Sequence, residues 1–249
     1  MSTMRLLIIH SSADLYGSDK SLLDFVSHTD HIVTVVVPCD GPLIAELRAA
    51  GATVFIGDVC KIQREMFSPL GFLELIRAAY RSWRFLGRIH QSAPFDLFYS
   101  NTVAVFGGAL TARLCGVPHI WHVREIMSTS RTLSAGFRFL VDALSTQVVC
   151  NSGETLAWIR PSGPKHKYHV IWNGFDASAP AHDRSTVRAA MDVATDEVLF
   201  VLVGRINRWK GQKLLVQAFS QLDAATRHKC KLAIVGSAPA GQEHFESAL

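Results

Sequence analysis

The sequence predicts an α/β protein with a parallel sheet covered on both faces, followed by the beginning of a second domain of the same kind. Short apolar runs alternate with longer helical patterns along the chain, and the runs are continuous in hydrophobicity. A small, polar, proline-containing segment interrupts this alternation, and a new strand-and-helix cycle follows it. Continuous apolar strands separated by helices are typical of buried parallel sheets.

Seven strands and several helices are expected before the interruption, so the first domain should cover residues 1–172. The expected strands are Arg5–Ile9, Ile32–Val37, Thr53–Ile56, Leu97–Ser100, His119–His122, Val148–Asn151 and His169–Ile171. The expected helices include Ser18–Ser27, Leu43–Ala50, Leu70–His90 and Val103–Leu114.

The interruption, residues 173–183, is expected to be an interdomain linker, and residues 184–249 part of a second domain. The expected elements of this second part are the strands Val198–Val203 and Lys231–Val235, the helix Gly211–Leu222 and a helix starting near Gly241. Two strands and two or three helices are too few to cover both faces of a sheet. We therefore expect the second domain to be truncated at residue 249.

The composition indicates a folded, mildly basic protein of a reducing compartment. Hydrophobic residues make up 49% and charged residues 18% of the chain, which argues against disorder. The net charge of +4 is below that of typical nucleic-acid binders and suits anionic small molecules. Five scattered cysteines favour neither a disulfide framework nor a zinc site. We expect a cytoplasmic protein, with peripheral contact to an anionic membrane as a further alternative.

The turn after the first strand is a candidate phosphate or acceptor loop. Gly17 is expected to permit a tight turn, and Ser18 or Asp19 to cap the helix that follows. The start of this helix faces the carboxyl edge of the sheet, where ligands bind in open α/β folds and where a helix N-terminus attracts anions. An ordinary strand-to-helix turn would produce the same pattern, and a G-x-G-x-x-G fingerprint is absent.

The sequence GRINRWKG, residues 204–211, is a candidate pyrophosphate site. Arg205 follows a buried strand directly, and Lys210 precedes the next helix. Two cations beside a helix N-terminus can hold a diphosphate and stabilise its charge as it leaves a sugar. A solvated basic loop fits the spacing equally well.

The sequence IWHVREI, residues 120–126, carries a candidate catalytic histidine. His122 ends an apolar strand and is therefore expected at the ligand-binding edge, where it could donate a hydrogen bond to a sugar hydroxyl. Asn101, at the end of the preceding strand, and Glu125 are additional candidates. A capping or core histidine is the alternative, since the chain has 11 histidines.

Several catalytic patterns are absent from the sequence. It contains no D-x-D pair, the usual clamp for a divalent metal on a sugar diphosphate, so no metal is expected. It also lacks G-x-S-x-G, H-E-x-x-H and a P-loop, which disfavours serine hydrolases, zinc proteases and P-loop NTPases.

The stretch Leu73–His90 combines an arginine row with apolar and aromatic residues. The arginines are Arg77, Arg81, Arg84 and Arg88, and the apolar side consists of Phe72, Ile76, Tyr80, Trp83 and Leu86. We expect the apolar side to cover the sheet and the arginines to be solvated. A helix lying on an anionic membrane is the alternative.

Four segments in this order resemble the family-four retaining glycosyltransferases, which have the GT-B fold of two Rossmann-like domains. The most specific is VLFVLVGRINRWKGQKLLVQAF, with its Gly-Arg and Lys-Gly-Gln. The others are KLAIVGSAP, VIWNGFD, and FDLFYSNTVAVFGGALTARLCGVPHIWHVREI. The resemblance covers nearly the whole chain.

The resemblance implies roles for the candidate residues. Gly204, Arg205 and Lys210 would hold the diphosphate of a UDP- or GDP-sugar, with Gly236 in the next glycine-rich turn. His122 would touch the transferred sugar, and the loop at Gly17 and Ser18 would approach the phosphates or the acceptor. The reaction would retain anomeric configuration without a metal or other cofactor, on a glycan or lipid-linked acceptor in polysaccharide biosynthesis.

Departures from the family pattern leave other functions open. The family's first loop often reads Gly-Gly-x-Glu, whereas this chain has Tyr16-Gly17-Ser18-Asp19, and the family's E-x7-E motif would lie beyond residue 249. Without that motif, residues 1–249 are expected to bind nucleotide weakly and transfer poorly. A non-catalytic Rossmann-like binding or partner module and a nucleotide-sugar epimerase are the alternatives.

Overall fold

The computed structural model describes residues 2–62, 66, 69–127, 131–159, 164–174, 182–239 and 241–249. The chain divides into two compact units, Met1–Asp176 (unit 1) and Ala177–Leu249 (unit 2). The predicted linker 173–183 includes residues 175–181, which lie outside the described residues.

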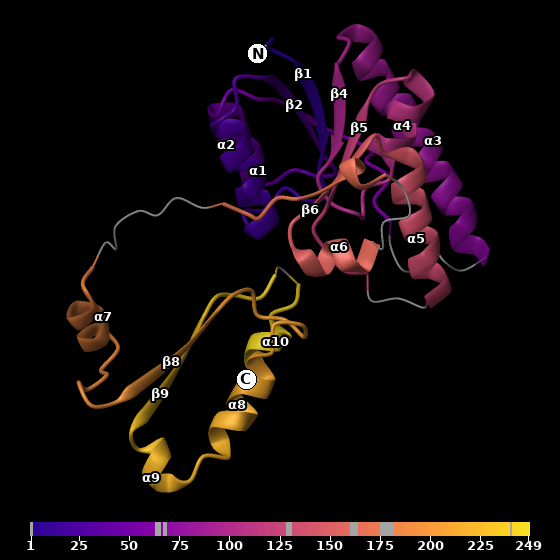
Figure 1. Ribbon diagram of the computed structural model, residues 1–249. Coiled ribbons are helices and arrows are strands. Elements are labelled where there is room, and N and C mark those ends of the chain that lie inside the picture. Colours follow the sequence, from indigo (N-terminus) through magenta and orange to yellow (C-terminus); the bar gives the residue numbers. More distant parts are fainter. Residues whose placement is uncertain are drawn as a thin grey trace. The chain divides into compact units, whose positions relative to one another are not determined.

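Unit 1 contains a seven-stranded sheet in the order β3-β2-β1-β4-β5-β6-β7, and every neighbouring pair is parallel (Figure 1). The strands are β1 (Arg5–Ile9), β2 (Ile32–Val37), β3 (Thr53–Ile56), β4 (Leu97–Ser100), β5 (His119–Val123), β6 (Gln147–Cys150) and β7 (Tyr168–Val170). The predicted α/β class with a parallel sheet is therefore confirmed. The strand order reverses between β1 and β4, and ligands bind at such switch points in open α/β sheets.

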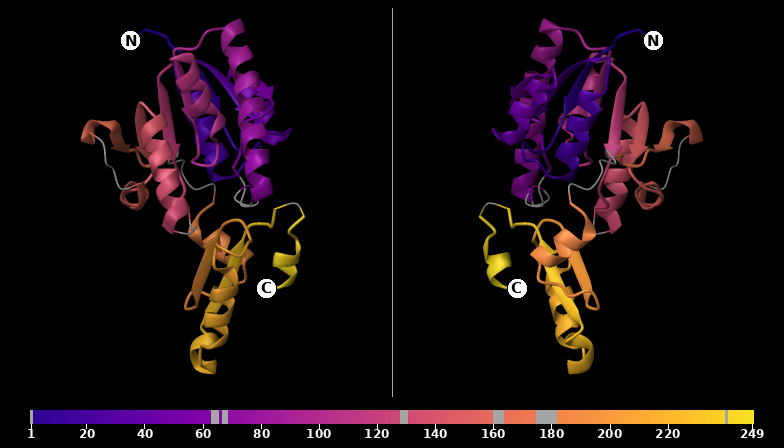
Figure 2. Two further views of the ribbon diagram at one scale, coloured as in Figure 1. Left: turned by 90° about the vertical axis from the view of Figure 1, so that its right-hand side faces the viewer. Right: turned by 90° about the vertical axis from the view of Figure 1, so that its left-hand side faces the viewer.

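Helices cover both faces of this sheet (Figures 1 and 2). They are α1 (Gly17–Ser27), α2 (Pro42–Ala49), α3 (Pro69–Ser92), α4 (Gly107–Cys115), α5 (Arg131–Leu144) and α6 (Gly153–Ile159), with a short 3-10 turn at Lys165–Lys167. Leu6 and Ile8 of β1 pack with α1 and α2, whereas Leu7 and Ile9 pack with α3 and α4. Both faces of the central strand are buried, which accounts for its continuously apolar sequence.

The helix predicted at Val103–Leu114 begins only at Gly107. The residues before it form a turn whose backbone is bonded elsewhere. Val105 pairs with Lys61 in an antiparallel bridge, and the amide of Ile62 donates to the carbonyl of Ala104 at 2.8 Å. These contacts with a distant segment replace the first helical turn, so the sequence prediction is wrong by four residues here.

The prediction for α3 is wrong in a more informative way. Of the apolar side expected to cover the sheet, only Leu86 is fully buried, while Phe72, Ile76, Tyr80 and Trp83 are exposed. The face that covers the sheet is smaller and includes the buried residues Ala78, Ser82 and Ile89. Two faces of the helix are thus largely apolar, and periodicity alone did not identify the buried one.

Unit 2 contains a two-stranded parallel sheet of β8 (Val198–Val203) and β9 (Cys230–Val235). Its helices are α7 (Arg184–Ala190), α8 (Gln212–Ser220), α9 (Ala224–Arg227) and α10 (His244–Ser247). Among the described residues of this unit, only Val193, Ile206 and Gln212 are buried.

None of the helices among the described residues is long and apolar enough to cross a membrane.

Candidate functional site

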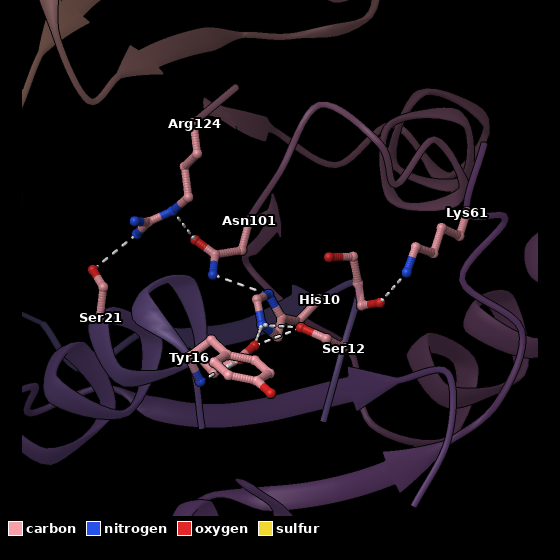
Figure 3. Close-up of polar contacts among 9 residues, drawn as sticks. His10, Ser12, Tyr16, Ser21, Lys61, Asn101 and Arg124 are labelled. Carbon is pink, nitrogen blue, oxygen red and sulfur yellow. Dashed lines mark hydrogen bonds and ion pairs between the residues drawn. The ribbon is translucent and has the colours of Figure 1, made fainter. Parts of the chain in front are cut away.

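A hydrogen-bonded chain of polar side chains lies at the switch point of the unit 1 sheet (Figure 3). His10 directly follows β1, and Asn101 directly follows the neighbouring β4. Their side chains meet because the two strands are adjacent: Asn101 Nδ2 lies 3.1 Å from His10 Nδ1. Both residues are almost fully buried. Strand order thus brings together two residues far apart in sequence.

The direction of the hydrogen bonds along this chain is fixed by its ends. Arg124 Nε can only donate, so at 3.0 Å it requires the Oδ1 of Asn101 as acceptor. Nδ2 of Asn101 then donates to His10 Nδ1, and His10 Nε2 donates to Asp19 Oδ1 at 2.6 Å. The order of donors therefore sets both the amide orientation of Asn101 and the tautomer of His10.

Asp19, in the first turn of α1, is the last acceptor in this series of hydrogen bonds. Its carboxylate also accepts from Ser12 Oγ at 2.5 Å and from the amide of Tyr16 at 2.9 Å. Burial by itself would raise the pKa of Asp19, but the hydrogen bonds from His10, Ser12 and Tyr16 outweigh it and hold the pKa below its ordinary value. Asp19 therefore stays ionised while almost wholly buried.

The predicted roles of Gly17 and Ser18 in this turn need correction. Helix α1 begins at Gly17 with Tyr16 as its N-cap, so Ser18 does not cap it, whereas Asp19 accepts from the amide of Tyr16 as the third helical residue of a capping box. Gly17 has no left-handed backbone angle, so it is not required for a tight turn. The residue that organises the loop is Asp19, through its contacts with the segment that follows β1.

Arg124, at the other end of this series of hydrogen bonds, contacts four parts of unit 1. Besides Asn101, its guanidinium donates to Ser21 on α1 at 3.0 Å and to Asn173 at 2.9 Å, and its carbonyl accepts from Asn151. Burial lowers its pKa, opposed by Tyr99 and Glu125. The arginine, which directly follows β5, consequently holds helix α1 and the segments after β4, β6 and β7 in one arrangement.

His122 lies near the end of β5, two residues before Arg124, and contacts Tyr99 of β4. Tyr99 Oη is 2.5 Å from His122 Nδ1, and the rings meet edge to face. Burial raises the pKa of Tyr99 to about 12, so its hydroxyl keeps the proton and donates it. Burial, together with Arg124, lowers the pKa of His122 to about 3, so the ring is neutral. Its own proton then resides on Nε2, a buried atom without a hydrogen-bond partner among the described residues.

Glu125, an additional candidate from the sequence, is hydrogen-bonded to the turn that follows β4. Its Oε2 accepts from Thr102 Oγ1 at 2.9 Å and from the amide of Val103 at 3.3 Å. Burial raises the pKa of this carboxyl, opposed by those hydrogen bonds. The side chain therefore stabilises the turn between β4 and α4.

Arg205 and Lys210 lie in the loop between β8 and α8 of unit 2. Asn207 organises this loop by accepting from the amides of Trp209 and Lys210, at 3.0 and 3.1 Å. The carbonyl of Arg205 accepts from the buried Gln212 at 2.9 Å. Lys210 is exposed and Arg205 half-buried. A hollow of about 690 Å³ beside α8 and α10 is lined by neither cation.

Gly204 and Gly236 directly follow the two strands of unit 2, and their backbones lie close together. A Cβ on Gly236 would lie 2.1 Å from the carbonyl oxygen of Gly204, and both glycines have positive φ, +155° at Gly204 and +148° at Gly236. Side chains at either position would be strained, so the two turns can approach only as glycines.

The structure thus assembles Asn101 with three residues whose roles were not predicted from the sequence: His10, Asp19 as an interior acceptor, and Arg124. His10 follows an apolar strand in the same way as His122, and that signal was available in the sequence. Among the described residues, no group of three or more His, Cys, Asp and Glu side chains is arranged to hold a metal ion.

Two family models match the chain in succession. The model described as Glycosyltransferase Family 4 matches residues 22–179, and the model described as Glycosyl transferases group 1 matches residues 183–248. No curated protein sequence matches the chain.

Solved structures of glycosyltransferases resemble the whole chain. Anabaena Alr3699/HepE in complex with UDP-glucose is 25% identical, with 98% of this chain and 64% of that one covered and a TM-score of 0.71. A glycosyltransferase from Rickettsia africae ESF-5 is 13% identical over 100% of this chain and 64% of its own, with a TM-score of 0.67. The lipopolysaccharide outer core galactosyltransferase WaaB, in its apo form, is 11% identical, with 98% of this chain and 64% of that one covered and a TM-score of 0.59. The predicted GT-B fold class is confirmed, and the chain spans about 64% of the length of these structures.

Proposed function

The chain belongs to Glycosyltransferase Family 4, and on that premise we propose that it transfers a hexosyl group from a UDP- or GDP-sugar to a glycan or lipid-linked acceptor. The transfer retains anomeric configuration, requires no metal or other cofactor, and serves polysaccharide biosynthesis. The enzyme works in the cytoplasm, in peripheral contact with an anionic membrane. Residues 1–172 form the acceptor-side domain, residues 173–183 the linker and residues 184–249 part of the donor-binding domain.

The observation that carries this proposal is the order of the two family matches along the chain. The second match contains the loop with Arg205 and Lys210. A glycosyl transfer leaves a nucleoside diphosphate, so negative charge grows on the leaving group as the sugar bond breaks. Two fixed cations stabilise that charge more in the transition state than in the ground state. This supports a role for both side chains at the diphosphate, and a metal ion is then not needed to neutralise it.

His122 is proposed to contact the transferred sugar. A neutral imidazole with its proton on Nε2 can donate a hydrogen bond to a sugar hydroxyl without adding a positive charge near the reacting carbon. The unpartnered Nε2 supports this role, because a buried donor without a partner is costly unless a ligand satisfies it.

The remaining candidates are proposed to contribute within each unit. Gly204 and Gly236 allow the backbone of unit 2 to approach the diphosphate closely. In unit 1, Gly17 and Ser18 lie in the first turn of α1, where backbone amides favour an anion or an acceptor hydroxyl. Asn101 holds the hydrogen-bonded chain below that turn.

Donor binding tests the proposal. Titration calorimetry with UDP and GDP should show that Arg205→Ala or Lys210→Ala weakens binding of the preferred nucleotide by about ten-fold or more, because each removes a charged contact to phosphate. Arg227→Ala and Lys229→Ala, at exposed positions just before β9 and outside this loop, are charge-matched controls and should bind like the unmodified chain. Equal affinities in all four variants would place the diphosphate elsewhere.

Product analysis separates transfer from the alternatives. With a nucleotide sugar and no acceptor, a transferase should leave the donor unchanged or hydrolyse it slowly. Conversion of the sugar to its epimer under these conditions would contradict the proposal.

A further inference from the structure

Helix α3 has a second apolar face that points away from the protein. Phe72, Ile76, Tyr80 and Trp83 follow one another at spacings that place them on one side of the helix. Their exposed fractions are 58%, 53%, 52% and 38%, and Leu73 beside them is 53% exposed. Such a contiguous set of large apolar side chains is unusual for a surface that remains in water.

A row of arginines borders this exposed face on one side. Arg81 is neutralised by Glu74 at 3.0 Å and by Asp58 at 3.5 Å. Arg77 and Arg88 form no ion pair within the described part of the chain. The surface thus combines exposed apolar side chains with arginine charges that are not neutralised.

The aromatic and basic residues are also arranged as a membrane interface requires. Arg84 lies 5.7 Å from the centre of the Tyr80 ring and donates to its hydroxyl, so the two side chains form one amphipathic pair. Beside it, Trp83, Arg84, Arg88 and Leu114 of α4 line a groove of about 480 Å³. Helices α3 and α4 lie side by side there (Figure 2). A groove with two guanidinium groups and an apolar wall suits a phosphate headgroup.

We propose that the outward face of α3, formed by Phe72, Ile76, Tyr80, Trp83 and the adjoining arginines, binds the surface of an anionic phospholipid membrane. The apolar side chains enter the boundary between headgroups and acyl chains, and the arginines contact lipid phosphates. Charge favours this occupant over a protein partner, since the row carries two arginines without a counter-ion among the described residues.

The position of α3 relates the proposed membrane contact to the candidate site of unit 1. Helix α3 runs antiparallel to the strands, so its first turns lie at the carboxyl edge of the sheet, where the His10–Asn101 pair is found (Figure 1). A membrane bound to these turns would present lipid-linked molecules at that edge. This inference deepens the peripheral membrane contact proposed above and rests on it.

Vesicle flotation tests the surface. The chain should float with vesicles of equal parts phosphatidylglycerol and phosphatidylcholine, and much less with pure phosphatidylcholine. Binding should weaken as salt rises from about 0.1 M to about 0.5 M, because surface charges are then screened. Equal binding to both lipids, or none to either, would overturn the proposal.

Substitutions locate the contact. The double variant Arg77→Ala/Arg88→Ala should lose about 25-fold in affinity for the anionic vesicles, from about five-fold for each arginine. Ile76→Ser/Trp83→Ser should lose about ten-fold or more through lost apolar burial. Arg48→Ala on α2 and Val187→Ser on α7 change exposed residues on other elements and should bind normally.

Two controls keep the result decisive. Circular dichroism must show unchanged helix content in each variant, and Arg77→Lys should restore most of the binding lost in Arg77→Ala, because charge is conserved. Sedimentation equilibrium without lipid distinguishes a protein interface: a dimer that dissociates in Ile76→Ser/Trp83→Ser would assign this face to a second copy of the chain and overturn the proposal. The assay contains no sugar nucleotide, so its failure would leave the donor-binding test unaffected.

Discussion

The two units contain similar apolar strands but bury them very differently. In unit 1, β2 reads IVTVVV and five of its six residues are buried, whereas in unit 2, β8 reads VLFVLV and none is buried. Val35 is fully buried and Val203 is 76% exposed. The difference lies in the surroundings of each strand: β2 has two neighbouring strands and helices on both faces, while β8 pairs with β9 alone among the described strands.

An apolar run therefore predicts that a strand forms, but the number of its neighbours decides whether it is buried. The polar groups of the units differ in the same way. Unit 1 holds an ionised carboxylate, Asp19, in its interior, whereas the ion pair of Asp192 with Lys231 in unit 2 is at the surface. We therefore expect substitutions in unit 1 to lower the free energy of unfolding more than matched substitutions in unit 2.

The largest contrast is expected between two aspartates. Asp19→Asn keeps one of the two acceptor oxygens, so its NH₂ group must face either the amide of Tyr16 or the side chains of His10 and Ser12. The free energy of unfolding should therefore fall by about 3 kcal/mol. Asp192→Asn should have no measurable effect, because the side chain is fully exposed. Urea unfolding, with hydrogen exchange on peptides from each unit, measures both. Similar losses of unfolding free energy in the two variants would contradict the expected difference between a buried and an exposed aspartate.

The next effect concerns acid pH. Burial lowers the pKa of His119 to about 3, so the folded ring stays neutral while the unfolded ring, with its ordinary pKa of 6.5, takes up a proton. Lowering the pH from about 7 to about 5 should therefore cost unit 1 about 2 kcal/mol at this residue. His119→Gln should reduce the pH dependence of unfolding by that amount. An unchanged slope would show that His119 protonates equally in both states.

A matched pair of valines tests burial alone. Val35→Ala in β2 should lower the free energy of unfolding by about 2 kcal/mol, through lost transfer energy and the cavity left behind. Val203→Ala in β8 should change it by less than about 0.5 kcal/mol. Denaturant unfolding of both variants checks the difference, and a comparable loss at Val203 would mean that β8 is covered in solution.

The smallest effect is expected at Tyr99. Tyr99→Phe removes one buried hydrogen bond and should cost about 1 kcal/mol of stability. The ¹⁵N chemical shifts of His122 should also change, because the proton is no longer confined to Nε2. Tyr80→Phe, which removes an exposed hydroxyl, is the matched control and should leave these shifts unaltered.

Much of the fold was predictable from local pattern. The predicted strands agree with the structure within one residue at every boundary, because a short and continuous apolar run bounded by turn residues is typical of a buried strand. The start of α4 was misplaced because Val105 pairs with Lys61, a contact that no local pattern encodes. The two apolar faces of α3 share a period, and only the packed structure distinguishes the one against the sheet.

The site was less predictable than the fold. His122 and Asn101 could be proposed because each ends a strand, yet the pairing of Asn101 with His10 depends on β4 lying beside β1. Strand order is a property of the whole sheet. Arg124 lies in the IWHVREI segment, but its role could not be predicted there, because the three contacts of its guanidinium come from segments distant in sequence.

Arg124 donates to Asn101, Asn101 donates to His10, and His10 donates to Asp19. This fixed direction of the hydrogen bonds also restricts which residues can occupy the four positions. An aspartate at position 101 would set two acceptors against each other unless His10 gained a proton, and a glutamine at position 10 would fit only if its amide pointed one way. Replacement at one position therefore demands compensation at its neighbour. Across related sequences, the residues at 10, 19, 101 and 124 should change together or stay the same.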